Sequence, residues 1–399
     1  MNQLIQRIKG DKVLWAIVVL LSLLSVLAVY SATQSLEYRS NKMSGFFLLK
    51  QIAMLAIGIA IIFLVHRVNY TKFARFSVIL YLLSIPLLIL TLAMGTTLNE
   101  GSRWLTIPGI GLTFQTSDLA KLALFMFVAR QLSIKQKVIK DFKKGFLPVL
   151  LPVLIICALI GWANLSTALL LGVTCCMLFF IGRVDVKHIG LLAAMGALGV
   201  LLLFGVSKLS GKGRGSTWQT RIERFMGDKA ETQEDEDADY QITQSKIAIA
   251  SGGFFGRGPG NSWAKNFLPH PYSDFVFAII VEEYGLLGAS GLVFLYVLFL
   301  WRSIKIFKRC PYAFGAFLAV ALSFTLVFQA LINMAVNVQL LPVTGLTLPL
   351  VSMGGSSIWF TCIAIGIILS VSRYVDDMEG KMAEATAKQI SKEEAKNNK

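Results

Sequence analysis

The residue best suited to chemistry is Asp274, which follows a long polar stretch and directly precedes an apolar run. A carboxylate at such a boundary can act as a general base that accepts a proton from a substrate hydroxyl. An aspartate in front of an apolar run is also a common helix N-cap. The two roles are compatible, because a helix N-terminus favours the ionised carboxylate from which a base must start. Asp274 is therefore a candidate general base, with capping as the alternative.

Two further carboxylates, Glu282 and Glu283, lie inside the apolar run that follows. Acidic groups within a membrane-length apolar segment are costly to bury and are functional candidates for that reason. Glu282 is eight residues from Asp274, so the two share roughly one face if the helix is continuous. The alternative is a structural ion pair inside the bundle with Lys50 or Lys121.

Arg103 and Trp104 form a second group, since Arg103 is the only basic residue of its short loop. A guanidinium can clamp a phosphate or carboxylate through paired hydrogen bonds. Trp104 can equally be an interfacial anchor. Asp118 can cap the next helix, and Lys121, about one turn later, can extend its side chain to an anionic head group.

Glycines followed by Ser356 and Ser357 form a third group, in Gly354-Gly355-Ser356-Ser357. Free backbone N–H groups at a helix start can bind an anion, although the same pattern also describes a tight loop and a cap. The Gly-rich stretches at 211–215 and 256–260 fit neither a P-loop nor a dinucleotide fingerprint.

The elements that must position these residues are membrane helices. Of the 399 residues, 55% are hydrophobic and 15% are charged, against about 25% charged residues in soluble domains. This excludes a soluble globular, a disordered and a fibrous protein, and the long unbroken apolar runs exclude a transmembrane barrel. We expect an all-α polytopic membrane protein with about ten transmembrane helices. The runs cover residues 13–31, 47–65, 76–94, 119–132, 146–162, 166–181, 189–206, 275–301, 313–334 and 356–371.

The basic residues orient the bundle. With both termini in the cytoplasm, the cytoplasmic segments hold 24 Lys and Arg and the four short outer loops hold three. This bias supports that topology, and it explains most of the net charge of +15 without a nucleic-acid partner. The five cysteines and three histidines show no disulfide framework and no zinc spacing.

Residues 207–273 form one long outer loop, and long loops are often functional. It contains Arg221, Arg224 and an acidic stretch at 231–239. We divide the chain into a membrane domain, 1–374, and a polar cytoplasmic tail, 375–399. Acidic, basic and anion-binding groups gathered on the outer face fit an enzyme that acts on a lipid-linked anionic substrate, and they also fit a lipid transporter.

Several separated motifs carry a resemblance to one family. They are Arg103-Trp104-Leu105 with Phe114-Gln115-x-Ser117; Tyr240-Gln241-Ile242-Thr243-Gln244-Ser245 with Ser251-Gly252-Gly253; Asp274-Phe275-Val276-Phe277 with Glu282-Glu283-x-Gly285; and Leu341-Pro342-Val343-Thr344-Gly345 with Ser352-x-Gly354-Gly355-Ser356-Ser357. They run in order over nearly the whole chain. With these motifs the chain resembles the SEDS proteins, the family of FtsW, RodA and SpoVE.

The resemblance implies a peptidoglycan glycosyltransferase that polymerises lipid II on the outer face of the bacterial cytoplasmic membrane. It also implies a class B penicillin-binding protein as transpeptidase partner. Asp274 matches the family's essential acidic residue, which we expect to be the catalytic base. We expect a divalent cation, Mg²⁺ or Mn²⁺, with unknown ligands. The residues expected to contact substrate or its diphosphate are Arg103, Trp104, Gln115, Asp118, Lys121, Arg221, Arg224, Gln244, Ser245, Glu282 and Ser356.

The chain departs from the family pattern at two places. Trp162-Ala163-Asn164 stands where members often have Gln-Pro-Asp, and Asp118 is a shorter acid than the usual glutamate. Gly345-Leu346-Thr347-Leu348-Pro349 resembles the FtsW branch more than the RodA branch. This favours septal synthesis with other division proteins over elongation. A lipid II flippase and a scaffold for the transpeptidase are the rival functions.

Overall fold

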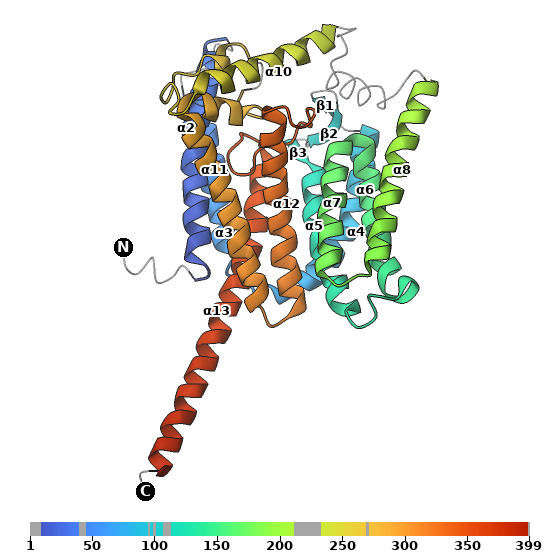
Figure 1. Ribbon diagram of the computed structural model, residues 1–399, viewed down its shortest axis with the longest axis vertical. Coiled ribbons are helices and arrows are strands. Elements are labelled where there is room, and N and C mark those ends of the chain that lie inside the picture. Colours follow the sequence, from blue (N-terminus) through green and yellow to red (C-terminus); the bar gives the residue numbers. More distant parts are fainter. Residues whose placement is uncertain are drawn as a thin grey trace.

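The computed structural model is a bundle of long helices with a small sheet and one helix across an end (Figure 1). It describes residues 9–39, 45–94, 96–98, 101–106, 113–210, 233–268 and 271–397. The helices of the bundle are α2 (Lys12–Arg39), α3 (Phe46–Val65), α4 (Thr71–Met94), α5 (Thr116–Lys135), α6 (Leu147–Ala163), α7 (Leu165–Ile181), α8 (Val186–Ser210), α11 (Val276–Arg309), α12 (Ala313–Asn337) and α13 (Ser356–Asn397).

Within the described residues, seven helices are long and apolar enough to cross a membrane, and α7 and part of α8 are shorter apolar helices. The remaining bundle helix is α5, which carries Asp118, Lys121, Arg130 and Lys135. It packs against α4, α6 and α12, so protein rather than lipid surrounds most of it. This position explains why α5 is the least apolar of the predicted spans. The all-α polytopic fold is confirmed.

The boundary between α6 and α7 is set by Asn164. The backbone of Asn164 is extended, and its side-chain oxygen accepts a hydrogen bond from the Thr167 N–H at 3.4 Å. An asparagine in this conformation is a common N-cap. The two apolar runs are therefore separate helices.

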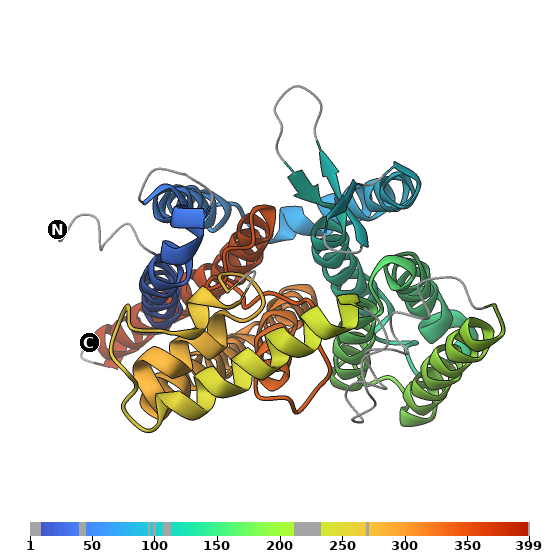
Figure 2. The ribbon, with the colours of Figure 1, turned by 90° about the horizontal axis from the view of Figure 1, so that it is seen from above.

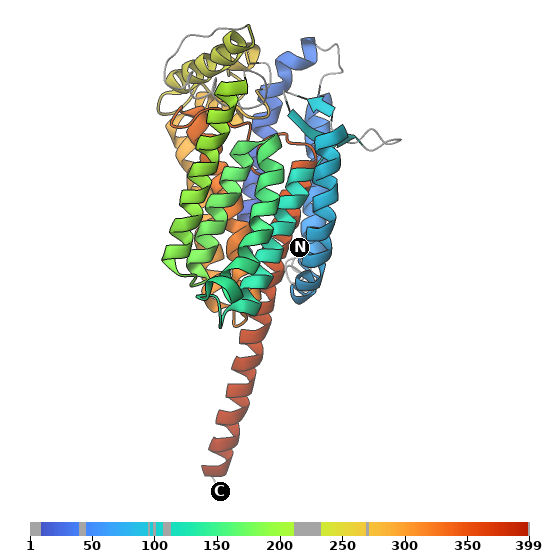
Figure 3. The same ribbon diagram turned by 90° about the vertical axis from the view of Figure 1, so that its right-hand side faces the viewer.

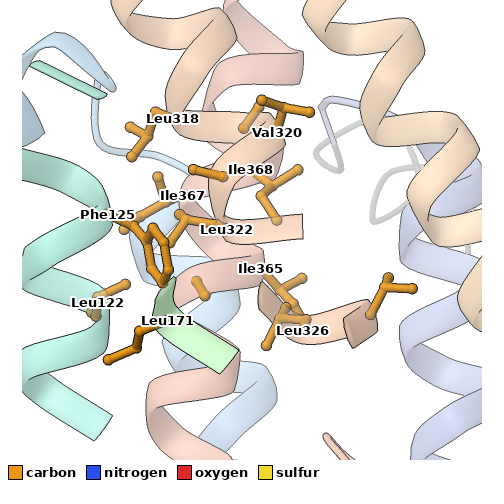
Figure 4. Packing of buried hydrophobic residues seen from close by; sticks show 14 of the residues in the cluster. Leu122, Phe125, Leu171, Leu318, Val320, Leu322, Leu326, Ile365, Ile367 and Ile368 are labelled. Carbon is orange, nitrogen blue, oxygen red and sulfur yellow. The ribbon is translucent and has the colours of Figure 1, made fainter. Parts of the chain in front are cut away.

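Aliphatic and aromatic side chains of α5, α7, α12 and α13 pack together in the core of the bundle (Figure 4). Phe125 of α5, Leu171 of α7 and Leu322 of α12 are buried together with Ile365 and Ile368 of α13. Burial of such side chains contributes about 1.5–3 kcal/mol each when the alternative is water. This core holds α5, α12 and α13 at fixed positions beneath the outer loops.

The long outer loop contains a helix. Helix α10 (Gln233–Gly252) lies across the outer end of the bundle (Figure 2). A three-stranded antiparallel sheet, β1 (Thr96–Leu98), β2 (Gly101–Thr106) and β3 (Thr113–Gln115), lies at the same end. Two short helical turns, Phe142–Phe146 and Ala264–Asn266, complete the elements.

Helix α11 is interrupted at Gly285, whose backbone has φ 64° and ψ −163°. The break frees backbone groups that a continuous helix would pair. The Gly-rich segment 252–258 pairs them instead: Arg257 N–H and Gly258 N–H donate to the carbonyls of Glu282 and Glu283, at 2.9 and 3.0 Å. In return, Leu286 N–H donates to the Gly253 carbonyl at 3.0 Å. The glycines of this segment thus serve close backbone packing.

The C-terminal segment is a direct continuation of α13, which extends beyond the bundle as one helix (Figure 3). Helix α2 begins at the same end, where Lys9 pairs with Asp377 at 3.2 Å. The buried Asp11 also pairs with Arg302 there. Both ends of the described chain therefore leave the bundle on the same side, as the basic-residue bias predicted.

Candidate functional site

Asp274 lies in the turn between the outer loop and α11, and its side chain is half-buried. The N-cap of α11 is Phe275, and no side chain caps this helix. The predicted N-cap role of Asp274 is therefore wrong, because the turn ends one residue later than the apolar pattern suggested. The Asp274 carboxylate accepts a hydrogen bond from Ser273 Oγ at 2.8 Å. The Asp274 carboxylate does not cap α11.

The backbone around Asp274 is fixed at three consecutive carbonyls. The amide nitrogens of Asn333 and Asn337 each donate to the Asp274 carbonyl at 2.9 Å. Ser352 Oγ donates to the Ser273 carbonyl at 2.6 Å, and Met353 N–H donates to the Tyr272 carbonyl at 2.9 Å. The turn is thus held by α12 and by the loop that precedes α13.

Tyr272 stands next to this turn and stacks on Phe47 of α3, with ring centroids 6.2 Å apart. Burial, followed by the charge of Asp274, raises the pKa of the Tyr272 phenol. The phenol therefore stays protonated near neutral pH and can donate a hydrogen bond.

Asp118 and Lys121 form an ion pair at 2.7 Å inside the bundle. Lys121 Nζ also donates to Gln329 Oε1 at 3.4 Å. Three predictions are corrected here. The N-cap of α5 is Gln115 and not Asp118, Lys121 turns to Asp118 rather than outward to a head group, and Lys121 does not pair with the acidic residues of α11.

The ion pair borders a groove between α5, α12 and α13. Its space is about 390 Å³, counted with its open side, and its polar lining includes Thr325, Ser357 and Thr361. Asp118 Oδ2 is buried and has no hydrogen-bond partner among the described residues. The groove thus combines charged and hydroxyl groups with Leu122, Phe125 and Leu326 of the apolar core, three residues that Figure 4 labels.

Two predicted groups distant in sequence meet at the outer end of this groove. In the register of β2 and β3, Trp104 lies opposite Gln115. The Gln115 N–H donates to Ser356 Oγ at 3.2 Å, and Ser356 begins α13. The backbone of Arg103 belongs to β2, but the side chains of Arg103 and Trp104, and all of Arg221 and Arg224, fall outside what the structure describes.

The start of α13 forms a tight turn, which was the alternative to an anion site at Gly354-Gly355-Ser356-Ser357. Ser357 N–H bonds the Gly354 carbonyl at 3.2 Å, and Ile358 N–H bonds the Gly355 carbonyl at 3.3 Å. The N–H groups of Ser357 and Ile358 are used within the turn, and the Ser356 hydroxyl accepts from the Gln115 N–H. The helix start is therefore a tight turn, and the substrate contact of Ser356 stays a prediction, because its O–H group can still donate.

Glu282 is surrounded by the protein's own donors. Its carboxylate accepts from Ser262 Oγ at 2.6 Å, from Trp263 N–H at 3.0 Å and from Ala264 N–H at 3.2 Å. Arg257 lies 3.4 Å away. Both carboxylate oxygens are engaged. The predicted substrate contact of Glu282 and its predicted pairing with Lys50 or Lys121 are therefore wrong, and Glu282 supports the outer loop instead.

Glu283 has a similar role, since it accepts from Ser31 Oγ of α2 and from Ser262 N–H. Ser245 of α10 is also buried, and its hydroxyl donates to the Asn337 carbonyl at 3.1 Å. This contact joins α10 to α12 and replaces the predicted substrate contact of Ser245. The neighbouring Gln244 is half-buried.

Asn333 and Asn337 were not predicted as site residues, because neither carries charge or matches a motif quoted above. A signal existed in their spacing. Gln329, Asn333 and Asn337 recur every four residues inside an apolar run, which places three amides along one face of the helix. Buried polar groups require partners, and here the partners are the two outer loops.

Metal ligands are sparse in the part of the chain that the structure describes, where no group of three or more His, Cys, Asp or Glu side chains could hold an ion. Mg²⁺ commonly needs only one or two carboxylates when substrate phosphates supply further oxygens. A cation bound with substrate would then take most of its ligands from the phosphates and water, and the cation stays a prediction.

Comparison with known proteins gives one consistent family. The family described as "Cell cycle protein", that of FtsW, RodA and SpoVE, matches residues 11–377. Stage V sporulation protein E of Bacillus subtilis (strain 168) is 34% identical over 377 residues, covering 91% of this chain and 97% of that protein. A probable peptidoglycan glycosyltransferase FtsW of Geobacter sp. (strain M18) is 33% identical, covering 92% and 98%.

Solved structures agree with the sequence relatives. A chain from a peptidoglycan synthase complex, described as coordinating polymerization and crosslinking, superposes with a TM-score of 0.72 at 26% identity and covers 92% of this chain and 98% of its own length. The rod shape determining protein RodA of Thermus thermophilus gives a TM-score of 0.66 at 25% identity, covering 91% and 97%.

Proposed function

The chain belongs to the FtsW, RodA and SpoVE family, and we propose that it is a peptidoglycan glycosyltransferase that polymerises lipid II on the outer face of the cytoplasmic membrane. Relatives of nearly equal length carry the name "Probable peptidoglycan glycosyltransferase FtsW". The observation that carries the proposal is Asp274, a half-buried carboxylate at the outer end of the bundle whose backbone is fixed while its side chain caps no helix.

The proposed reaction is a single displacement. The 4-hydroxyl of the GlcNAc of one lipid II attacks the anomeric carbon of a MurNAc at the end of a second lipid-linked glycan. The new glycosidic bond forms as the bond to undecaprenyl diphosphate breaks, which inverts the anomeric configuration. Asp274 takes the hydroxyl proton, and general-base catalysis of this kind contributes about 10²–10⁴-fold.

The leaving diphosphate needs positive charge. Among the described residues Lys121 is a candidate, because it lies in the groove next to the outer loops and is held by Asp118. Arg103, Arg221 and Arg224 are further candidates. A divalent cation bound through the substrate phosphates would supply electrostatic stabilisation of the leaving group.

The flippase alternative requires polar groups through the whole depth of the membrane. In the described bundle the inner part of the groove is lined by Leu122, Phe125 and Leu326, which belong to the buried apolar core (Figure 4). This arrangement favours an enzyme that works at one face.

We further propose a septal role in cell division, with a crosslinking transpeptidase of the class B penicillin-binding proteins as partner. Several relatives carry the FtsW name, and one structural relative belongs to a complex described as coordinating polymerization and crosslinking. The RodA-like role in elongation is the alternative. Depletion of the protein distinguishes them, because loss of septa supports the division role and loss of rod shape supports elongation.

The deciding experiment is polymerisation of labelled lipid II by the purified protein with its transpeptidase partner and Mg²⁺ or Mn²⁺. Wild type is compared with Asp274→Asn, and folding and partner binding are confirmed for both. Polymer from wild type alone supports Asp274 as the base. Equal polymer from both would remove Asp274 from that role, and no polymer from wild type would contradict the glycosyltransferase itself.

A further inference from the structure

Helix α12 carries a ladder of three buried amides, Gln329, Asn333 and Asn337, each four residues from the next. Every member donates to a backbone carbonyl of an outer loop. Gln329 donates to Thr347 at 2.9 Å, Asn333 donates to Leu346 at 2.7 Å, and both asparagines donate to Asp274. The ladder therefore joins the loop before α13 to the turn that carries Asp274.

The orientation of the Asn337 amide is fixed by its surroundings. Its oxygen accepts from Ala278 N–H in the first turn of α11 at 3.2 Å, and its nitrogen donates to the Asp274 and Asn333 carbonyls at 2.9 Å each. A rotated amide would place its nitrogen against an N–H group and its oxygen against two carbonyls. Asn337 therefore holds the Asp274 carbonyl and the start of α11 at once.

Asn333 uses its amide nitrogen twice, on the Asp274 carbonyl and on the Leu346 carbonyl. It is 2% exposed, and Asn337 is 0% exposed. A buried carbonyl that loses its donors carries a desolvation cost, so removal of one amide favours movement of the turn. That movement would displace the Asp274 carboxylate, since carbonyl and side chain belong to the same residue.

We propose that Asn333 and Asn337 are positioning residues that hold Asp274 at its reactive geometry through its own backbone carbonyl. The inference rests on the proposed function of Asp274 as base. A displacement of about 1 Å at a catalytic group can reduce the rate by about 10²-fold. Asn333 and Asn337 are not among the residues that line the groove, so their substitution should change the binding of lipid II little.

The test measures kcat and KM for lipid II per folded complex, with the transpeptidase partner present. The variants are Asn333→Ala and the milder Asn333→Ser, whose hydroxyl is too short to replace the amide. Ser323→Ala is the matched control. Ser323 is also buried on α12, and its hydroxyl bonds only the Ala319 carbonyl of its own helix. Thermal unfolding reports the folded fraction of each.

We expect kcat to fall about tenfold or more in either asparagine variant that folds, with KM within about twofold of wild type, and Ser323→Ala to match wild type. A purely structural role would lower the folded fraction while kcat per folded complex stayed unchanged, and that result would overturn the inference. A parallel rise in KM would overturn it as well. A wild-type protein that makes no polymer would overturn the proposed function, and the inference with it.

Discussion

The ammonium of Lys121 lies 2.7 Å from the carboxylate of Asp118, one turn earlier on α5, and both side chains are largely buried. The groove that they border opens between α5, α12 and α13. A buried ion pair contributes little net stability, but removal of one partner leaves an uncompensated charge at a cost of about 3–5 kcal/mol.

Lys121→Met should therefore destabilise the protein by lowering its unfolding temperature, because Asp118 loses its counter-charge. The double variant Asp118→Asn with Lys121→Met should recover most of that stability, because no charge remains buried. It should not recover polymerisation if Lys121 offsets the leaving diphosphate. Thermal unfolding and polymerisation of lipid II, measured on the same preparations, check both statements. Full activity in the double variant would exclude the role of Lys121 in the reaction.

Gly256→Ala should prevent stable folding of the outer loop. Gly256 has φ +81°, and an added Cβ would lie 2.1 Å from the Glu283 carbonyl oxygen. Gly260→Ala is the control, since Gly260 has φ +79° but no atom within 4 Å of the added Cβ. Both substitutions incur the left-handed backbone cost of about 1–2 kcal/mol, and only Gly256→Ala adds the clash. Equal yields of folded protein for Gly256→Ala and Gly260→Ala would contradict the described packing of the loop against α11.

Glu282→Gln should loosen the segment 257–266 without changing the affinity for lipid II. The substitution puts an N–H₂ group either against the Trp263 N–H or against Ser262 Oγ and the Ala264 N–H, depending on the orientation of the amide. Each unmatched buried group costs about 1–3 kcal/mol. Limited proteolysis of the outer loop and the unfolding temperature measure the effect. Glu384→Gln, at an exposed position of α13, is the control. A raised KM for lipid II in a fully stable Glu282→Gln protein would restore the substrate-contact role.

Removal of divalent cations should stop polymerisation and leave the fold intact. Among the described residues no group of three or more His, Cys, Asp or Glu side chains could hold an ion, and Mg²⁺ is commonly bound through one or two carboxylates and substrate phosphates. Treatment with EDTA should abolish the product, and added Mg²⁺ or Mn²⁺ should restore it, while the unfolding temperature stays constant. Undiminished polymer in EDTA would exclude the cation, and a large fall in unfolding temperature would indicate a structural ion.

The sequence alone determined the class of fold, the orientation of the bundle and the segments that carry the candidate site. Each of these depends on local information. Apolar runs of membrane length predict helices whatever their neighbours are, and the basic residues report which side each loop faces. The motif residues around Asp274, Arg103 and Asp118 were found in the same way, since residue type and spacing are visible along the chain.

The partners of those residues were decided only by the tertiary structure. Asn333 and Asp274 are 59 positions apart, and Gln115 and Ser356 are 241 positions apart. Hydrogen bonds over such separations depend on helix packing, which no local pattern specifies. For that reason Glu282 was predicted to contact substrate, although donors of the outer loop occupy both of its carboxylate oxygens. The apolar run after Asp274 was expected as one helix, although the helix is interrupted at Gly285. The uncharged asparagines that fix Asp274 became visible only once α12 and the outer loops were placed together.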